Sequence, residues 1–154
     1  MQIGPSARDT FAEMMQTTVK PELEQLGLRV SNTTFRLPAP DHYAALGIQQ
    51  SRDNVWIRLM FTVNLRVVSN ADWAAYSARI GDNSPPDPMT NEAVGWGERL
   101  GHLTPERADK WWTVWGGFPA DDVAKDLVTA IRDYGLPVMR EKLGSRRSSQ
   151  PSMT

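Results

Sequence analysis

The residues from Val55 to Val68 alternate between two classes of side chain, and this is the strongest pattern in the chain. The odd positions hold only apolar side chains, while the even positions include two arginines, an asparagine and a threonine. Successive side chains of a strand point to opposite faces, so this period of two predicts a strand with one face in the core. We expect Leu59 and Phe61 at the centre of that core. A bend or bulge is expected near Asn64, because the run is long for one strand.

A turn before this strand predicts a hairpin. Residues 43–50 form a second predicted strand, and Ser51–Asn54 has the composition of a turn. If these four residues are the whole turn, the register is fixed. It pairs Gln50 with Val55, Ile48 with Ile57, Leu46 with Leu59 and Ala44 with Phe61. Both strands then place their apolar residues on one face, as pairing in a half-buried sheet requires.

Apolar residues spaced three and four apart predict three helices, and each stripe ends near a glycine suited to a left-handed C-cap. The stripes cover residues 11–26, 73–80 and 123–134, followed by Gly27, Gly81 and Gly135. Pro21 interrupts the first stripe. Because proline lacks an amide hydrogen and crowds the preceding turn, we expect a kink or restart there. Further strands are expected over 33–37, 93–103 and 110–115, and a last short helix over 137–143.

The order helix, three strands, helix, two strands, helix is typical of an α+β fold. We therefore predict an antiparallel sheet of about five strands, with N-terminal, middle and C-terminal helices packed mainly on one face. The length of 154 residues fits one ordinary domain, which we assign to residues 1–143. The stretch Gly144–Thr154 has no apolar surface to bury and is expected to be a disordered tail.

The balanced charge excludes functions that need a strong electrostatic field. The chain has 17 basic and 18 acidic residues, giving a net charge of −1, and both signs are spread evenly along it. No basic region of the kind that grips a nucleic acid backbone is present, so no nucleic acid partner is expected. The sequence has no cysteine, no signal-peptide pattern and no uninterrupted apolar segment of membrane-spanning length. We therefore expect a cytoplasmic protein without a membrane partner.

Residue types that support catalysis or metal binding are sparse. His42 and His102 are far apart in the sequence, and neither lies in a pattern of metal-ligand spacing. Gly95–Gly101 has the wrong glycine spacing for a dinucleotide-binding loop, and no helix pattern follows it. We therefore assign no catalytic residue, cofactor or metal, and we favour a protein that is not an enzyme. A dispersed triad that uses His102 stays open, because triads are defined in space and not by spacing.

Tryptophans are concentrated in one short segment. Trp111, Trp112 and Trp115 lie within five residues of one another. On a strand, Trp111 and Trp115 share one face and Trp112 takes the other. Aromatic surface is therefore expected outside the core, unless the sheet is covered on both sides. Core packing and a platform for a ligand or partner are both consistent with this pattern.

The predicted hairpin register also defines a candidate pocket on the face of the sheet away from the core. Small residues at positions 45 and 47 leave a shallow floor, apolar side chains wall it, and an arginine stands over Gly47. An arginine beside aromatic walls suits an anionic or planar group. The candidate binding residues are Tyr43, Gln49, Trp56, Arg58, Met60, Arg66 and Trp112. The alternative is that other elements cover this face and Arg58 pairs with a carboxylate such as Glu98.

Four blocks of the sequence together resemble an uncharacterised bacterial family. They are PELEQLGL at 21–28, QQS at 49–51 followed by FTVNL at 61–65, RLGHLTPERADKWW at 99–112, and YGLPV at 134–138. Their order and spacing are similar to those of the family called domain of unknown function 4304. The resemblance implies a small α+β domain and brings no established activity or catalytic residue with it. Leu28 stands where family members often have phenylalanine, which affects only packing.

These observations leave two classes of function. The first is a non-catalytic binding module, including one that neutralises a protein partner as immunity proteins do. The missing acidic surplus argues against a basic nuclease as that partner. The second is an enzyme or small-ligand binder that uses the Arg- and Trp-lined pocket. The expected partner is accordingly a protein or a small anionic ligand, and the oligomeric state is not predicted. A flat, Trp-rich exposed patch favours the first class, and a concave pocket with a strongly shifted acid or base favours the second.

Overall fold

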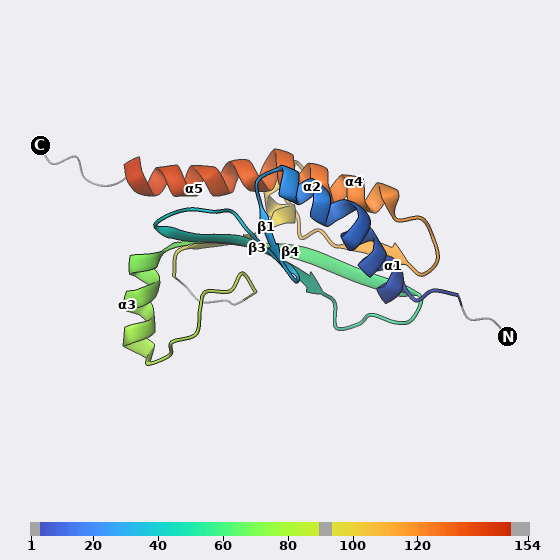
Figure 1. Cartoon of the computed structure of the whole chain (residues 1–154), viewed down its shortest axis with the longest axis horizontal. Coiled ribbons are helices and arrows are strands. Elements are labelled where there is room, and N and C mark those ends of the chain that lie inside the picture. Colours follow the sequence, from blue (N-terminus) through green and yellow to red (C-terminus); the bar gives the residue numbers. More distant parts are fainter. Residues whose placement is uncertain (1–3, 90–93, 149–154) are drawn as a thin grey trace, which may run out of the picture.

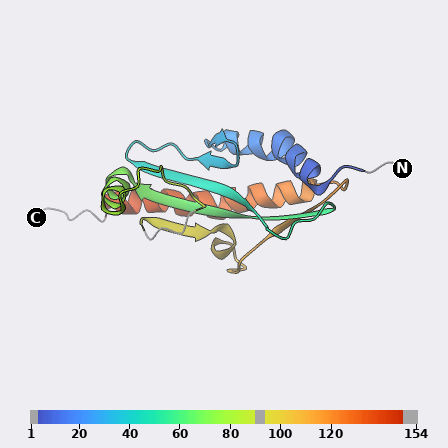
Figure 2. The same cartoon turned by 90° about the horizontal axis from the view of Figure 1, so that it is seen from below.

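Six strands form one open sheet in the computed structural model, which describes residues 4–89 and 94–148. The strands are β1 (Arg29–Ser31), β2 (Thr34–Arg36), β3 (His42–Gln50), β4 (Arg58–Ser69), β5 (Trp96–Arg99) and β6 (Trp112–Trp115). They pair antiparallel in the order β1–β2–β3–β4–β5, and β6 also pairs with β4. β1 and β2 lie toward one edge of the sheet and β5 toward the other (Figure 2). The predicted α+β class and antiparallel sheet are confirmed, and β1 is the strand that the sequence pattern missed.

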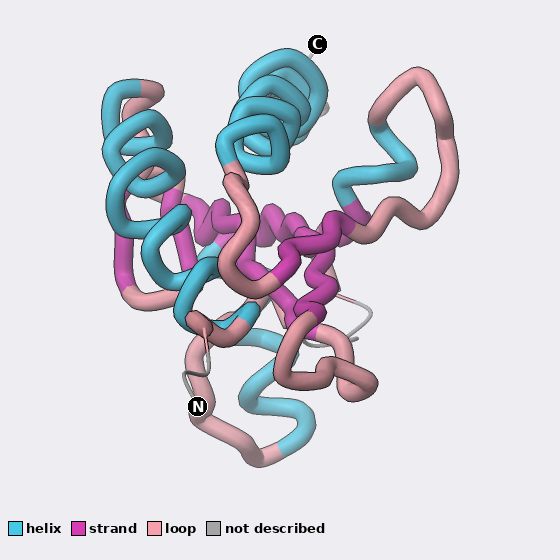
Figure 3. Tube along the Cα trace, turned by 90° about the vertical axis from the view of Figure 1, so that its right-hand side faces the viewer, coloured by secondary structure: helices cyan, strands magenta, loops and turns pink. Residues whose placement is uncertain are grey.

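Most of the helices cover one face of the sheet. These are α1 (Ala7–Met14), α2 (Lys20–Gln25), α4 (Asp121–Ala130) and α5 (Leu136–Ser148), which lie above the sheet in Figure 1. α3 (Asn70–Ile80) lies on the opposite side, and the end-on view of Figure 3 shows the same layers. The predicted placement of the helices mainly on one face is confirmed, with the middle helix as the exception.

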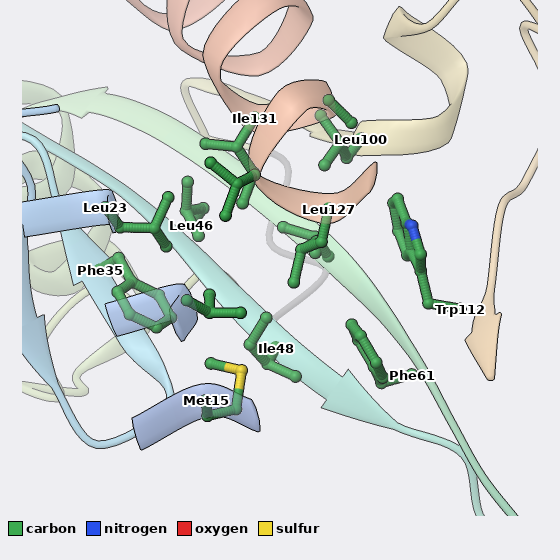
Figure 4. Close-up of a cluster of buried hydrophobic side chains, with 14 of the residues drawn as sticks. Met15, Leu23, Phe35, Leu46, Ile48, Phe61, Leu100, Trp112, Leu127 and Ile131 are labelled. Atoms are coloured by element: carbon green, nitrogen blue, oxygen red, sulfur yellow. The ribbon is translucent and has the colours of Figure 1, made fainter. Parts of the chain in front are cut away.

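β4 is the centre of the core because its odd positions face the helices. Leu59, Phe61, Val63, Leu65 and Val67 are each at most 4% exposed. The Phe61 ring contacts Phe11 of α1 edge-on, with centroids 5.1 Å apart, and stacks on Trp112 of β6 at 5.8 Å. Figure 4 shows Phe61 and Trp112 in the layer that also receives the side chains of α4. The period of two therefore identified the core face correctly.

The register of the β3–β4 hairpin differs from the predicted one by six residues. The observed pairs are Gln50–Phe61, Ile48–Val63, Leu46–Leu65 and Ala44–Val67. The prediction was wrong because Ser51–Asn54 is only part of the connection. The chain makes a second tight turn between Val55 and Arg58, closed by reciprocal backbone hydrogen bonds of 3.0 and 3.3 Å. Because six is even, each side chain of β3 and β4 stays on its predicted face.

Two helical segments continue where the sequence indicated a break. α1 passes into α2 through a π-helical turn at Met15–Val19. The helix therefore widens by one turn just before Pro21, at the place where a kink or restart was predicted. A second π-helical turn, Ile131–Gly135, joins α4 to α5, so the helix does not end at Gly135 as predicted. A Cβ on this glycine would lie 3.0 Å from Leu100 Cδ1. Gly135 therefore allows close packing against Leu100 and does not end the helix.

The remaining boundaries agree in part with the prediction. α3 begins where Ser69 Oγ accepts a hydrogen bond from Asp72 N at 3.0 Å, and it ends at Gly81, which has a φ of 71°. α5 runs to Ser148, past the predicted helix end at Leu143, and residues 149–154 of the predicted tail lie outside the described residues. The strand predicted over 93–103 is shorter, because a 3-10 turn at 100–103 follows β5; position 93 lies outside the described residues.

Candidate functional site

The pocket predicted from the hairpin register is not formed, because the register brings other residues together. Gly47 lies opposite Asn64 and not opposite Arg58, which pairs with β6 instead. The shallow floor is also filled, since a Cβ on Gly47 would lie 2.8 Å from Cγ of Pro88. The loop that follows α3 therefore covers the part of the sheet on which the predicted pocket depended.

Three of the seven candidate residues lie near the start of β4. Trp56 is in the turn before the strand, with most of its side chain exposed. Arg58 donates from Nη2 to the backbone oxygen of Asp53 at 3.4 Å, and it is not paired with Glu98 as the alternative required. Met60 is half-buried on the same face. None of these three residues lies over the part of β3 that was predicted to form the floor.

Two further candidates have packing roles. Tyr43 is buried with Val68 and packs against Trp73 of α3, and this burial raises the pKa of its hydroxyl. Trp112 is buried in the core, where its Nε1 donates to Asp126 Oδ2 at 2.8 Å. Trp112 therefore occupies the opposite face from the predicted pocket. The expectation that Trp112 and Trp115 lie on different faces of the strand is confirmed, since Trp115 is exposed.

Gln49 and Arg66, the last two candidates, line a cleft on the face of the sheet away from α4 and α5. This hollow, called the sheet-face cleft below, encloses about 980 Å³. Its wall also includes the turn 50–53 and the end of the loop after α3. Six of its lining residues determine its chemistry: Gln49, Asn64, Arg66, Gly97, Arg99 and Trp111.

A hydrogen-bonded network crosses the sheet-face cleft. Asn64 donates from Nδ2 to Gln49 Oε1 at 2.8 Å and accepts at Oδ1 from Arg99 Nε at 3.2 Å. Arg99 Nη1 contacts both carboxylate oxygens of Asp109 at 2.8 and 3.0 Å, and its guanidinium carbon lies 5.2 Å from the ring centroid of Trp111. Burial raises the pKa of Asp109, but hydrogen bonds from Arg99 and Trp111 outweigh burial and lower this pKa overall. An ionised Asp109 thus fixes the orientation of Arg99.

Arg66 supplies a second guanidinium beside this network. It is only 4% exposed, and its Nη1 donates to the backbone oxygen of Val94 at 2.9 Å. Gly97 lies opposite it on β5, and a Cβ there would be 3.4 Å from Arg66 Nη2. The missing side chain of Gly97 therefore leaves the cleft open above a buried cation.

A second surface feature is apolar and lies at the end of the sheet where β4 begins. The large side chains of this apolar end are exposed by 46–67%; they are Val55, Trp56, Ile57, Trp115 and Phe118. Backbone hydrogen bonds join the segments that carry them. Gly116 N donates to Ile57 O at 2.8 Å, Phe118 N donates to Trp115 O at 3.1 Å, and Ala7 N of α1 donates to Trp56 O at 2.8 Å. The five side chains therefore extend from one anchored backbone unit.

Metal-binding clusters and membrane-spanning helices are both absent from the described residues. In residues 4–89 and 94–148, no group of three or more histidine, cysteine, aspartate or glutamate side chains is arranged to hold a metal ion. In the same part of the chain, every helix is too short or too polar to cross a membrane.

Sequence reasoning missed Arg99, Trp111 and Asp109 as neighbours of Gln49 and Asn64. Their spacing along the chain gives no hint that they meet, because Arg99 follows Asn64 by 35 residues and the other two lie still further along. One signal was present, however. Three of the blocks on which the family resemblance depends, at 49–51, 61–65 and 99–112, contribute lining residues to this one cleft.

Comparison with known proteins gives a family but no activity. The family model described as Domain of unknown function (DUF4304) matches residues 19–141. No curated protein and no solved structure matches the chain. The matched residues include the whole lining of the sheet-face cleft and the five side chains of the apolar end.

Proposed function

We propose that this chain, which belongs to the DUF4304 family, is a non-catalytic protein-binding module that contacts its partner through the apolar end. One observation carries the proposal. Of the seven large apolar side chains that are exposed in the described part of the chain, five belong to the apolar end. Contiguous exposed apolar surface on a folded protein is typical of an interaction site.

The composition and anchoring of the apolar end suit a binding surface. Tryptophan and phenylalanine are enriched in the cores of interfaces, and a few such side chains carry most of the binding energy. Trp56 and Phe118 extend from backbone that is hydrogen-bonded to α1 and β6, respectively, so little backbone freedom is lost when a partner binds. A preorganised surface keeps more of its contact energy as affinity.

The charges around the apolar end favour a partner without a strong net charge. Arg8 lines a small hollow with Val55 and Trp56, and Asp121 follows Phe118 at the start of α4. Both signs are thus present beside the apolar side chains, and the whole chain carries a net charge of −1. We therefore commit to a different protein that presents an apolar surface with a mixed polar rim.

Affinity capture with matched variants tests this proposal. The bait is the full chain, and the test variant is Trp56→Ala combined with Phe118→Ala, which removes two aromatic side chains from the apolar end. The control is Ile80→Ala on α3, a large apolar side chain that is 49% exposed on a different element. We expect one protein that is captured by the wild type and by the control and is lost with the double variant. Reconstitution with the purified partner should then show a loss of affinity of at least about tenfold.

Two results would contradict the proposal. If the wild type, the control and the double variant capture the same proteins in equal amounts, the apolar end does not bind a partner. If the wild type self-associates in analytical ultracentrifugation and the double variant does not, the occupant is a second copy of the chain and not a different protein. A neutralising role, as in immunity proteins, predicts in addition that the purified partner loses its own activity when the wild type binds.

A further inference from the structure

We infer that the sheet-face cleft is a second binding site, which takes a ligand through its carboxylate and uses Arg99 as the main anchor. This inference goes beyond the proposed function and does not depend on it. None of the five side chains of the apolar end lines the cleft, so the two sites are built from different residues.

The lining of the cleft is rich in arginine donors. Three arginines line it, Arg52, Arg66 and Arg99, against two carboxylates, Asp53 and Glu98. The carboxylate of Glu98 is engaged with a histidine, whose Nδ1 lies 2.6 Å away. A third carboxylate, Asp109, pairs with Arg99 at 2.8 Å and balances its charge. The cleft therefore offers an anion guanidinium N–H donors, which form stronger hydrogen bonds to a charged acceptor than to a neutral one.

Arg99 has donor capacity left for a ligand. A guanidinium carries five N–H groups. Nε donates to Asn64, and Nη1 is used by the two oxygens of Asp109. Nη2 contacts only Gln49 Oε1, at 3.5 Å, which is longer than a typical hydrogen bond. Among the described residues, the second N–H of Nη2 therefore has no acceptor, although the group is held rigidly and faces the cleft.

Trp111 and the amides of the cleft complete a site for a carboxylate. The ring of Trp111 lies beside the Arg99 guanidinium, which fixes the plane of the guanidinium and the direction of its free Nη2 N–H. The remaining N–H of Nη2 can donate one charge-assisted hydrogen bond to a carboxylate oxygen. Gln49 and Asn64 line the cleft with amides that can contact the polar remainder of the ligand. The enclosed volume of about 980 Å³ is at the upper end of the range of roughly 300–1,000 Å³ for small-molecule sites.

The convergence of separate sequence blocks on this cleft supports the inference independently of charge. Gln49 comes from the QQS block, Asn64 from the FTVNL block, and both Arg99 and Trp111 from the 99–112 block. These blocks are distant in the sequence, and core packing alone does not require their polar members to meet. A shared ligand would explain why polar residues of three blocks lie together on the sheet.

Two sources can supply the carboxylate, a small organic acid or the C-terminus of a peptide, and the experiment distinguishes them. The indole N–H signal of Trp111, assigned with a Trp111→Phe variant, is followed by NMR during titration into the millimolar range. The probes are glutarate, an acetylated tripeptide with a free C-terminus, the same peptide with an amidated C-terminus, and inorganic phosphate. We expect saturable shifts with glutarate or the free peptide and no saturable shift with the amidated peptide. Tighter binding of glutarate would point to an organic acid, and tighter binding of the free peptide to a peptide C-terminus.

Two variants test whether the shifts of the Trp111 signal arise from binding in the sheet-face cleft. Arg99→Lys keeps the charge but removes the fixed Nη2 donor, and it should weaken binding of the carboxylate probe at least about tenfold. Because this change also disturbs Asp109, Gly97→Val provides a second variant. Position 97 is exposed in a strand with room for a Cβ, so we expect an unchanged melting temperature and weaker binding as the side chain fills the cleft above Arg66.

The inference is overturned by any of three results. The first is a Trp111 signal that stays fixed with both carboxylate probes. The second is that phosphate produces the same shifts as the carboxylates with the same salt dependence, which would mean that the cleft only accumulates counter-ions. The third is that Gly97→Val binds the carboxylate probe as tightly as the wild type does, which would place the ligand elsewhere.

Discussion

Replacing Phe61 with alanine should remove a large part of the stability of the fold. The side chain is fully buried on β4, where its ring contacts Phe11 of α1 and stacks on Trp112 of β6. Burying a phenylalanine stabilises by about 1.5–3 kcal/mol, and each aromatic contact adds about 0.5–1.5 kcal/mol. The free energy of unfolding should therefore fall by about 4 kcal/mol. This value agrees with the range of about 3–5 kcal/mol for truncation of a buried phenylalanine to alanine.

A thermal melt with a matched control tests this value. For a chain of this length, 1 kcal/mol corresponds to roughly 2–4 °C in melting temperature, so Phe61→Ala should lower it by roughly 8–16 °C. Phe118→Ala deletes the same atoms from a side chain that is 67% exposed, and its effect should stay within about 0.5 kcal/mol. If both variants melt alike, or if Phe61→Ala barely moves the transition, that face of β4 is not the core.

Two further changes test the packing of the loop after α3 and the network of the cleft. Gly47→Ala should destabilise by about 1–3 kcal/mol, because the new Cβ would lie 2.8 Å from Pro88 Cγ; an unchanged urea-unfolding midpoint would mean that the loop moves freely. The folded-state pKa of Asp109 is lowered, with hydrogen bonds from Arg99 and Trp111 outweighing the opposing effect of burial. The stability that Asp109 contributes is therefore present above its unfolded pKa of about 3.9 and is lost as the pH falls through the lower folded value. Melting curves should accordingly show Asp109→Asn less stable than the wild type at pH 7, with the difference shrinking below about pH 4; a constant difference would contradict this assignment.

The face of each residue on β4 could be predicted, but the register of the hairpin could not. Side-chain alternation records only whether a position is odd or even, and an even shift leaves every residue on the same face. Val55 and Ile57 continue the apolar alternation, yet they lie in a tight turn that is anchored by hydrogen bonds to α1 and β6. Those anchors come from residues about 50–60 positions away, and no local pattern encodes them.

The candidate site illustrates the same limit. The face of the sheet on which Gln49 and Arg66 lie was predicted correctly, because that assignment depends on side-chain alternation alone. Arg99 and Trp111 were not predicted, because their position depends on where β5 and the segment before β6 meet β4. The apolar end was not predicted either. Side-chain alternation assigned Val55 and Ile57 to the core face, but both lie in an exposed turn before β4.

β4 pairs with β3 on one edge and with both β5 and β6 on the other. Because β5 and β6 are synthesised after β4, this second edge of β4 has no partner strand until they emerge. α4, which covers part of its apolar face, also follows much later in the chain. At roughly 5–20 residues per second, the ribosome needs roughly 3–12 s to proceed from Ser69 to Ala130. During those seconds the open edge can pair with strands of other nascent chains. The protein should therefore depend on chaperones mainly while it is being made, and much less once β6 and α4 are in place.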